Sequence, residues 1–222
     1  MACQEGDMKL INLLIDVGAE IQVEQGVPGL ALQKAAIWGH LEVCKLLVSR
    51  GVDVNAQGDK HGADVNAASC EVYVTTLQAA AFNGPVRPID TLVEAGADVN
   101  THDPKLRTAL ISTARAANKK WTYKLLDFGA NPNLIGPYGS AAHAACRGWE
   151  LELIKLFLDE CFHVNLKGKH GHVLQAACNP RGDVHRLPCV RLLIERGSDV
   201  YAREASMKQH SKVQQTMVSS KL

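Results

Sequence analysis

Aromatic residues are scarce in this sequence, and neither sign of charge is in excess. Phe, Trp and Tyr make up 5% of its 222 residues, so a core must be built mainly from Ala, Leu, Ile and Val. Lys and Arg number 24 against 23 Asp and Glu, which leaves no overall field to attract nucleic acid or an anionic membrane. No apolar run reaches the roughly 18 residues needed to cross a bilayer. We therefore expect a globular protein that binds neither nucleic acid nor membranes.

The short motifs of common enzyme classes are also missing. The sequence contains no G-x-x-x-x-G-K-[ST] phosphate loop, no H-E-x-x-H zinc helix and no G-x-S-x-G nucleophile turn. Carboxylates such as Glu42, Glu150 and Glu152 are scattered, and we expect them to solvate the outer faces of helices. We therefore predict no enzymatic activity and no cofactor.

The cysteines show neither a disulfide framework nor paired metal ligands. Their number is odd and no C-x-x-C pair occurs, so we expect reduced, mostly buried thiols in an intracellular protein. The cytoplasm is the expected compartment, with the nucleus as the alternative. The seven residues are Cys3, Cys44, Cys70, Cys146, Cys161, Cys178 and Cys189.

Two groups of residues could carry chemistry. A Cys- and His-rich stretch near the C-terminus offers zinc ligands, but His170 and His172 are expected on a hairpin and Cys178 in a helix facing its neighbour. The pair His143 and Cys146 has the spacing of a thiol and its base on one helix face. We interpret the first group as accidental enrichment and the pair as structural, and we predict no metal. The first group is Cys161, His163, His170, His172, Cys178, His185 and Cys189.

An internal repeat of about 33 residues organises the chain. A glycine, or once a cysteine, follows each apolar helical cluster, at intervals of 33, 45, 33, 32 and 36 residues. Nineteen residues before four of these closing positions stands a second anchor, Leu32, Leu77, Leu110 or Ala142, followed by small residues. Each unit thus predicts a helix, a tight turn, a second helix and an extended finger. The closing residues are Gly18, Gly51, Gly96, Gly129, Cys161 and Gly197.

These elements resemble ankyrin repeats. The resemblance rests on the period, on the L-Q-x-A-A and G-A-D-V-N elements and on the run from Gly39 to Leu47, G-H-L-E-V-C-K-L-L. It implies an all-α solenoid of about six helix-turn-helix units with hairpin fingers over residues 1–204, followed by a polar tail, 205–222. The Gln variant of the motif is similar to fungal arrays, often attached to NACHT-type nucleotide-binding domains. His143 stands where ankyrins keep a backbone-bonding His.

The pattern departs from regular repeats at three places. The chain opens in the middle of a unit, with Ala2-Cys3 at the small-residue position, so we expect a truncated first unit and a fragment of a larger protein. Residues 52–76 contain a duplicated finger sequence, interpreted as a surface loop or as a contact loop for a partner. A shorter insertion, 179–188, separates the helices of the last unit.

The resemblance also implies where a partner binds. In ankyrin arrays the positions two, five and six after the Leu anchor, together with the fingers, form a concave surface. Applied here, they include Ala79 and Ser112, and the fingers add charges such as Arg107. Trp38 and Phe82 could instead cover the adjacent repeat. The predicted partner-binding residues are Lys34, Ile37, Trp38, Phe82, Asn83, Arg115, Arg147 and Tyr138.

We therefore predict a non-enzymatic module for protein–protein interaction, whose partner is another protein. A structural array that only spaces other domains is the alternative, and a thiol or metal-dependent enzyme is the least favoured. We expect a monomer that can self-associate through its uncapped N-terminal unit, because exposed apolar surface favours association.

Overall fold

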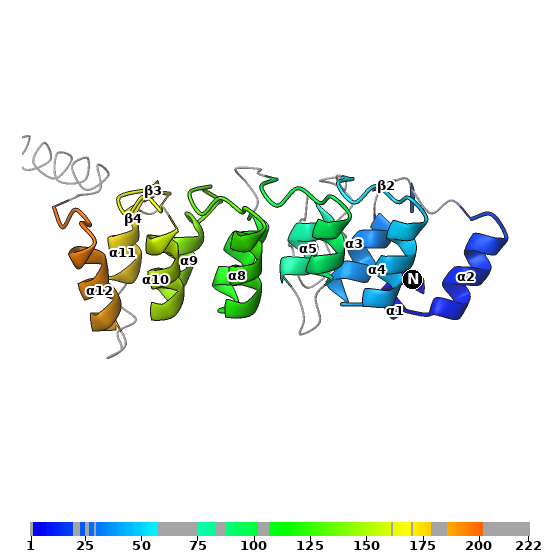
Figure 1. The fold of residues 1–222 in the computed structure, drawn as a ribbon, viewed down its shortest axis with the longest axis horizontal. Helices are drawn as coiled ribbons and strands as arrows, with labels where there is room; N and C mark the ends of the chain where they lie inside the picture. Colours follow the sequence, from blue (N-terminus) through cyan, green and yellow to red (C-terminus); the bar gives the residue numbers. More distant parts are fainter. Residues whose placement is uncertain are drawn as a thin grey trace, which may run out of the picture.

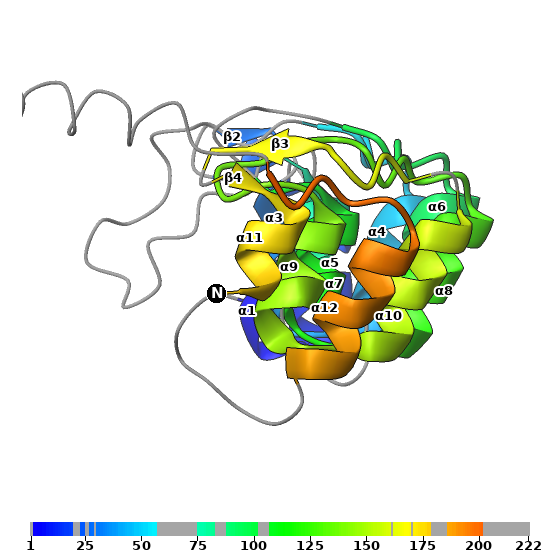
Figure 2. The same ribbon diagram turned by 90° about the vertical axis from the view of Figure 1, so that its left-hand side faces the viewer.

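The computed structural model describes residues 2–19, 23–24, 27–28, 30–56, 75–82, 88–101, 107–160, 162–169, 171–178 and 186–201. Within these ranges twelve helices follow one another in pairs. The odd-numbered helices form an inner row and the even-numbered helices an outer row, with the fingers along one edge of both (Figures 1 and 2). The helices are α1 Ala2–Glu5, α2 Met8–Asp16, α3 Leu30–Ile37, α4 Leu41–Ser49, α5 Thr76–Phe82, α6 Ile89–Glu94, α7 Ala109–Arg115, α8 Lys119–Asp127, α9 Ala141–Gly148, α10 Leu151–Asp159, α11 Val173–Ala177 and α12 Arg186–Glu195.

Glycine ends the outer helices, as the repeat predicts. Gly96 and Gly129 adopt φ values of 89° and 83°, in the left-handed region that glycine tolerates without strain. The next residue then donates its N–H back into the helix, as from Ala97 to the Leu92 carbonyl at 2.9 Å. The other described closing glycines also have positive φ, whereas Cys161 lies outside the described residues.

The turn between the two helices of a unit needs the same backbone geometry, although its residue varies. Gly6 and Gly39 have φ of 73° and 74°, and Gly39 confirms the predicted left-handed cap. In two later units the equivalent residues are Ala117 and Trp149, with φ of 52° and 54°. A side chain there costs about 1–2 kcal/mol, so the repeat retains this geometry against local preference.

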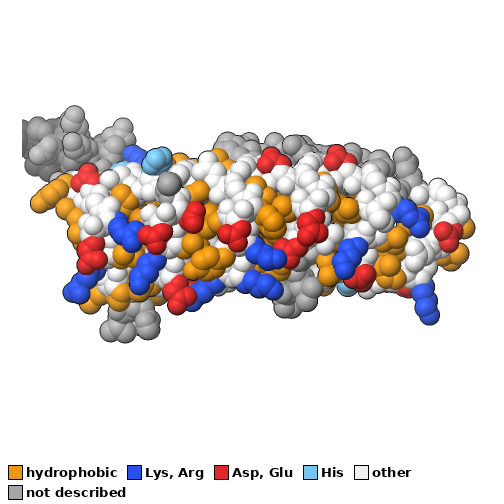
Figure 3. Space-filling model, in the orientation of Figure 1, with side chains coloured by type: hydrophobic (Ala, Val, Ile, Leu, Met, Phe, Trp, Pro, Cys, Tyr) orange, Lys and Arg blue, Asp and Glu red, His pale blue; other side chains and the backbone are white. Residues whose placement is uncertain are grey.

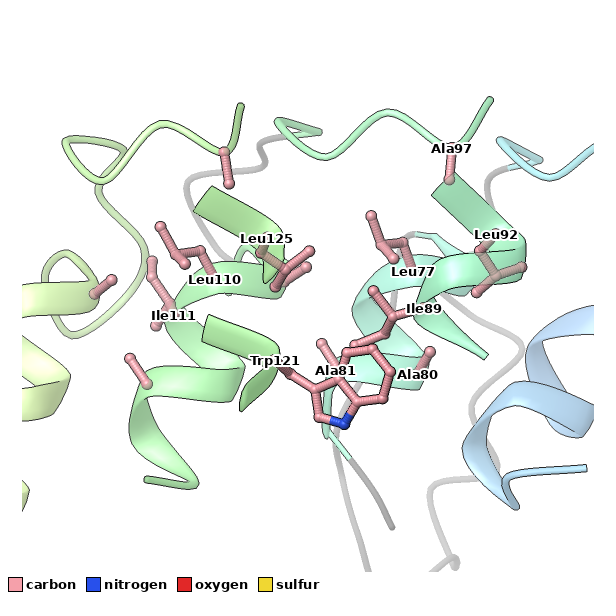
Figure 4. Close-up of a cluster of buried hydrophobic side chains, with 14 of the residues drawn as sticks. Leu77, Ala80, Ala81, Ile89, Leu92, Ala97, Leu110, Ile111, Trp121 and Leu125 are labelled. Atoms are coloured by element: carbon pink, nitrogen blue, oxygen red, sulfur yellow. The ribbon is translucent and has the colours of Figure 1, made fainter. Parts of the chain in front are cut away.

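Small residues let successive inner helices approach closely. Each of α3, α5, α7 and α9 packs against the inner helix that follows it. The predicted anchors Leu32, Leu77, Leu110 and Ala142 are buried, which confirms their assignment. Trp121 of α8 is buried and extends toward Ala81 of the preceding unit (Figure 4). One such unit has no separate core, so stacking supplies its burial.

Asparagine side chains link consecutive fingers. Asn100 donates Nδ2 to the Gly129 carbonyl at 2.9 Å, while its Oδ1 accepts the Asn131 N–H at 2.7 Å. Asn55 and Asn165 make the same two bonds to the following finger. Each link satisfies two backbone groups that would otherwise depend on water. The short strands of the fingers are β1 Val23–Glu24, β2 Val27–Pro28, β3 Lys167–Gly168 and β4 Gly171–His172, paired antiparallel as β1–β2 and β3–β4.

Charges of both signs alternate over the outer helices (Figure 3). Lys124 of α8 pairs with Asp90 of α6 at 2.6 Å, and Lys119 pairs with Glu152 of α10. These exposed pairs add little stability individually, yet they leave the outer face without a field of one sign. In the part of the chain that the structure describes, no helix is long and apolar enough to span a membrane.

Apolar side chains stand exposed on the first outer helix. Leu10, Leu13 and Leu14 of α2 are exposed, and Val17 follows them at the helix end. Helix α1, which pairs with α2, has only four residues. The predicted duplicated finger, the insertion before α12 and the polar tail lie largely or wholly outside the described residues.

Candidate functional site

The described members of the predicted partner-binding set lie on inner helices, directly after one of them, or on one finger. Trp38, just after α3, is 59% exposed, and Lys34 and Ile37 of the same helix are half-buried. Arg115 is exposed at the end of α7, and Arg147 is half-buried in the last turn of α9. The structure describes neither Asn83 nor the side chain of Phe82.

The position two residues after the anchor was wrongly assigned to the open surface in two units. Ala79 and Ser112 are both buried. Each belongs to an inner helix that stacks against inner helices on both sides, where small side chains permit the contact. The fifth and sixth positions, represented by Arg115 and Trp38, are the exposed ones.

Three of the predicted residues meet in one hollow of about 470 Å³. Arg115, Arg147 and Tyr138 line it together with Arg107, which precedes α7. Its walls therefore come from two neighbouring inner helices and the finger between them. The remaining lining residues are Ile111, Gly139, Ser140, Ala144 and Gly148.

Tyr138 is held at the tip of a two-residue turn. Gly136 and Gly139 form an antiparallel bridge, with N–H to carbonyl distances of 3.1 and 3.2 Å. Pro137 lies between them and fixes its own φ, which restricts the turn. Gly139 has φ of 110°, and a Cβ there would lie 2.5 Å from the His143 ring, so only glycine fits. The backbone therefore sets the position of the tyrosine.

Two of the guanidinium groups lie over the tyrosine ring. The Arg107 and Arg147 guanidinium carbons lie 5.7 Å and 5.9 Å from the centre of the Tyr138 ring. Such contacts are favourable because the face of the ring is electron-rich. A guanidinium stacked on a ring keeps the N–H groups at its edge directed away from that ring.

His143, next to the hollow, bonds to Ser140, which lines it. Its Nδ1 accepts the Ser140 N–H at 3.1 Å, and its Nε2 donates to the Gly171 carbonyl at 3.2 Å, which joins α9 to the next finger. Burial lowers the pKa of His143 from 6.5 to about 4, the Gly171 bond opposes this shift, and the positive charge of Arg147 lowers the pKa further. The ring is therefore neutral, and the predicted backbone-bonding role is confirmed.

In other units a glutamine makes the equivalent bond to the next finger. Gln33 and Gln78 occupy the position of His143 and donate to the Ala56 and Thr101 carbonyls at 3.5 and 3.2 Å. In α7 the position is Ile111, whose side chain has no polar group and lines the hollow instead.

The pair His143 and Cys146 has no arrangement for nucleophilic catalysis. Both His143 nitrogens are engaged in the bonds above, so neither is available as a base for the thiol. Cys146 is fully buried, and burial raises the pKa of its thiol. Burial likewise raises the pKa of Cys44 to about 12. These thiols are packing groups, as the sequence indicated.

The C-terminal Cys and His residues are dispersed. His163 and His172 are on the finger, and Cys189 is buried in α12. The prediction that Cys178 lies in the inner helix and faces its neighbour is wrong. Helix α11 ends at Ala177, and Cys178 is its exposed C-cap residue. Across the described ranges, no three of these side chain types gather as metal ligands. Cys161, His170 and His185 lie outside those ranges.

Sequence reasoning missed part of the hollow. The sequence pattern places Arg107 among the finger charges and outside the binding set, and it gives no indication that Ile111 and Ser140 belong to the site. The signal for the turn was present as Gly136-Pro137-Tyr138-Gly139, since Gly and Pro at these places favour a tight connection.

Comparison with known proteins supports the repeat architecture. Residues 1–103 match a family model described as ankyrin repeats in three copies. The fold is similar to the ankyrin repeat domain of human ASB11, with a TM-score of 0.73 and 22% identity over 92% of this chain and 86% of that one.

Several relatives are longer proteins. The palmitoyltransferase AKR1 of the yeast Lachancea kluyveri is 28% identical over 219 residues, which cover 94% of this chain and 27% of that protein. The L-asparaginase of Dirofilaria immitis is 26% identical over 62% of this chain and 27% of that protein. A putative ankyrin repeat-containing protein of Treponema pallidum is 29% identical over 140 residues, which cover 62% of this chain and 43% of that protein. The predicted similarity to fungal NACHT-linked arrays stays a prediction. The described helices and fingers, the family match over residues 1–103 and the structural likeness agree on an ankyrin repeat fold.

Proposed function

We propose that this chain is a non-enzymatic protein-binding module that holds a partner protein on its inner helices and fingers. The observation that carries the proposal is the hollow between α7, α9 and their finger, where Arg115, Arg147 and Tyr138 converge. Tyr and Arg are enriched where protein interfaces derive most of their binding energy. A rigid turn also positions Tyr138, so little backbone entropy of this finger is lost on binding.

Trp38 extends the proposed surface to the second unit. An aromatic side chain that only covered the adjacent repeat would be largely buried, whereas Trp38 is 59% exposed. It follows the end of α3, and α3 lies in the same inner row of helices as α7 and α9 (Figure 2). We therefore include Trp38 and Ile37 in the binding surface.

Catalysis is not part of the proposal, although two relatives are named as enzymes. The chain spans 27% of the length of both, the palmitoyltransferase and the L-asparaginase. In this chain the nearest approach to a thiol–histidine pair, Cys146 and His143, is committed to packing and backbone bonding. An ankyrin array that serves as the binding part of a longer intracellular protein accounts for these similarities.

Site-specific photo-crosslinking tests the proposal. The chain offers a matched pair of tyrosines, since Tyr138 in the hollow is 48% exposed and Tyr123 on the outer helix α8 is 44% exposed. A photoreactive phenylalanine analogue would replace each in turn, in cells of the source organism. We expect the variant at position 138 to form a discrete adduct with another protein and the variant at 123 to form none.

Other outcomes would contradict the proposal. An adduct from position 123 alone would place the binding surface on the outer helices. Adducts from neither position would favour a structural spacer without a partner of its own. Replacing Trp38 by Ala should reduce the adduct at 138 while the melting temperature changes little, because the side chain is mostly exposed.

A further inference from the structure

The hollow differs from the rest of the surface in its charge. Three arginines line it and no carboxylate of the described residues does, in a chain with 24 basic and 23 acidic residues. On the outer helices, cations such as Lys119 and Lys124 pair with carboxylates. Within the described ranges, neither Arg115 nor Arg147 pairs with a carboxylate. A local excess of positive charge therefore stands at the proposed binding surface.

The repeat places two of these arginines in register. Arg115 and Arg147 end neighbouring inner helices, which pack against each other, and both occupy the fifth position after the anchor. In α3 the same position is Ile37. Among the described inner helices, the paired arginines are thus a feature of α7 and α9 that α3 does not repeat. A nucleic acid backbone, which presents evenly spaced phosphates, would need a longer basic track.

We infer that the hollow receives a carboxylate side chain from an acidic segment of the partner protein. This inference rests on the proposed function. Guanidinium groups bind carboxylates through two parallel N–H donors, which match the two carboxylate oxygens. The Tyr138 ring holds Arg147 over its face and leaves the edge of that guanidinium for such bonds. A volume of about 470 Å³ accepts one or two acidic side chains rather than a folded domain.

Fluorescence anisotropy can test this inference with a defined probe. The probe is a fluorescein-labelled octapeptide of alternating Glu and Asp flanked by Gly, and its control has Gln and Asn at the same positions. Binding is measured to the wild-type chain, to the double variant Arg115→Gln with Arg147→Gln, and to Arg50→Gln with Arg191→Gln. The last two variants change the net charge equally, and Arg50 and Arg191 are exposed residues of the outer row.

We expect Arg115→Gln with Arg147→Gln to weaken binding of the acidic peptide by about ten-fold or more. Arg50→Gln with Arg191→Gln should weaken it by less than about two-fold. Replacing both Arg115 and Arg147 by Lys should give an intermediate loss of affinity, because Lys keeps the charge but not the paired donors. Far-UV circular dichroism verifies that each variant is folded.

Three results would overturn the inference. Equal losses from the two Gln variants would indicate non-specific attraction by charge. Equal affinity for the amide peptide would show that carboxylates are not recognised. Binding of a matching phosphoserine peptide about ten-fold more tightly than the acidic one would assign the hollow to phosphate. In each case a persistent cross-link from position 138 would leave the proposed function standing.

Discussion

Replacing His143 by Gln should remove a pH dependence from the stability of this chain. Other units already carry this side chain, and in two of them Gln33 and Gln78 bond to the next finger from the equivalent position. At pH 7 we expect the introduced glutamine to keep that bond and to change the free energy of unfolding by less than about 1 kcal/mol. Gln does not titrate, so the variant should differ from the wild type only as the pH falls.

The magnitude follows from the two pKa values of His143. Its pKa is about 4 in the folded chain against an ordinary value of 6.5. The unfolded state therefore binds the proton first as the pH falls below 6.5, so the stabilisation present above that pH is lost toward pH 4. For a side chain that is 2% exposed, this amounts to about 2 kcal/mol between pH 7 and pH 5, on the order of 3 kcal/mol in full.

Urea unfolding at pH 7, 6 and 5, followed by circular dichroism, measures the effect. The relevant quantity is the difference in unfolding free energy between wild type and His143→Gln, because carboxylates and other histidines cancel in it. We expect this difference to move by about 2 kcal/mol in favour of the variant from pH 7 to pH 5. A difference that stays constant with pH would refute the assignment of His143 as a buried neutral ring.

Three further predictions concern stability along the array. Ala117→Gly should raise the free energy of unfolding by about 0.5–1 kcal/mol in a urea titration, because Ala117 is exposed and has φ of 52°; no gain would mean that its backbone is not strained. Asn100→Ala should lower it by about 1–2 kcal/mol through loss of both bonds to the next finger, including that to Gly129, with the exposed Asp127→Ala as control. Amide hydrogens of α2 should exchange faster than those of α7, since α2 leaves Leu13 and its neighbours exposed and α7 stacks between two inner helices; equal protection would contradict this.

The spacing of a few residue types was sufficient to predict the fold. Glycines such as Gly96 and Gly129 need positive φ wherever an apolar helix must stop and turn into a finger, and the structure confirms that conformation. Buried anchors such as Leu77 and Leu110 recur because stacked units share one continuous core. Periodicity reveals the fold because each unit obeys the same packing constraint.

The site was predictable only as a set of positions. Arg115 and Arg147 could be assigned to the open surface because the helix period exposes the fifth residue after the anchor. Their meeting with Tyr138 depends on how far one finger reaches over two helices, and no local pattern encodes that distance. The burial of Ser112 likewise depends on how closely α7 approaches its neighbours, which is a property of the assembled stack.

The residues at the turn between the two helices of a unit show that packing of neighbouring units determines the backbone conformation there. Ala117 and Trp149 adopt nearly the same backbone conformation as Gly39, although an L side chain there costs about 1–2 kcal/mol. Contacts between neighbouring units must offset this cost, so the assembled array rather than the local sequence determines the backbone. The exposed fifth position can then change from Ile37 in α3 to Arg115 in α7 while the helix keeps its place in the inner row. A scaffold with this property lets the binding surface change without altering the fold, which is why the repeat identifies the architecture and only the side chains in the hollow indicate the partner's chemistry.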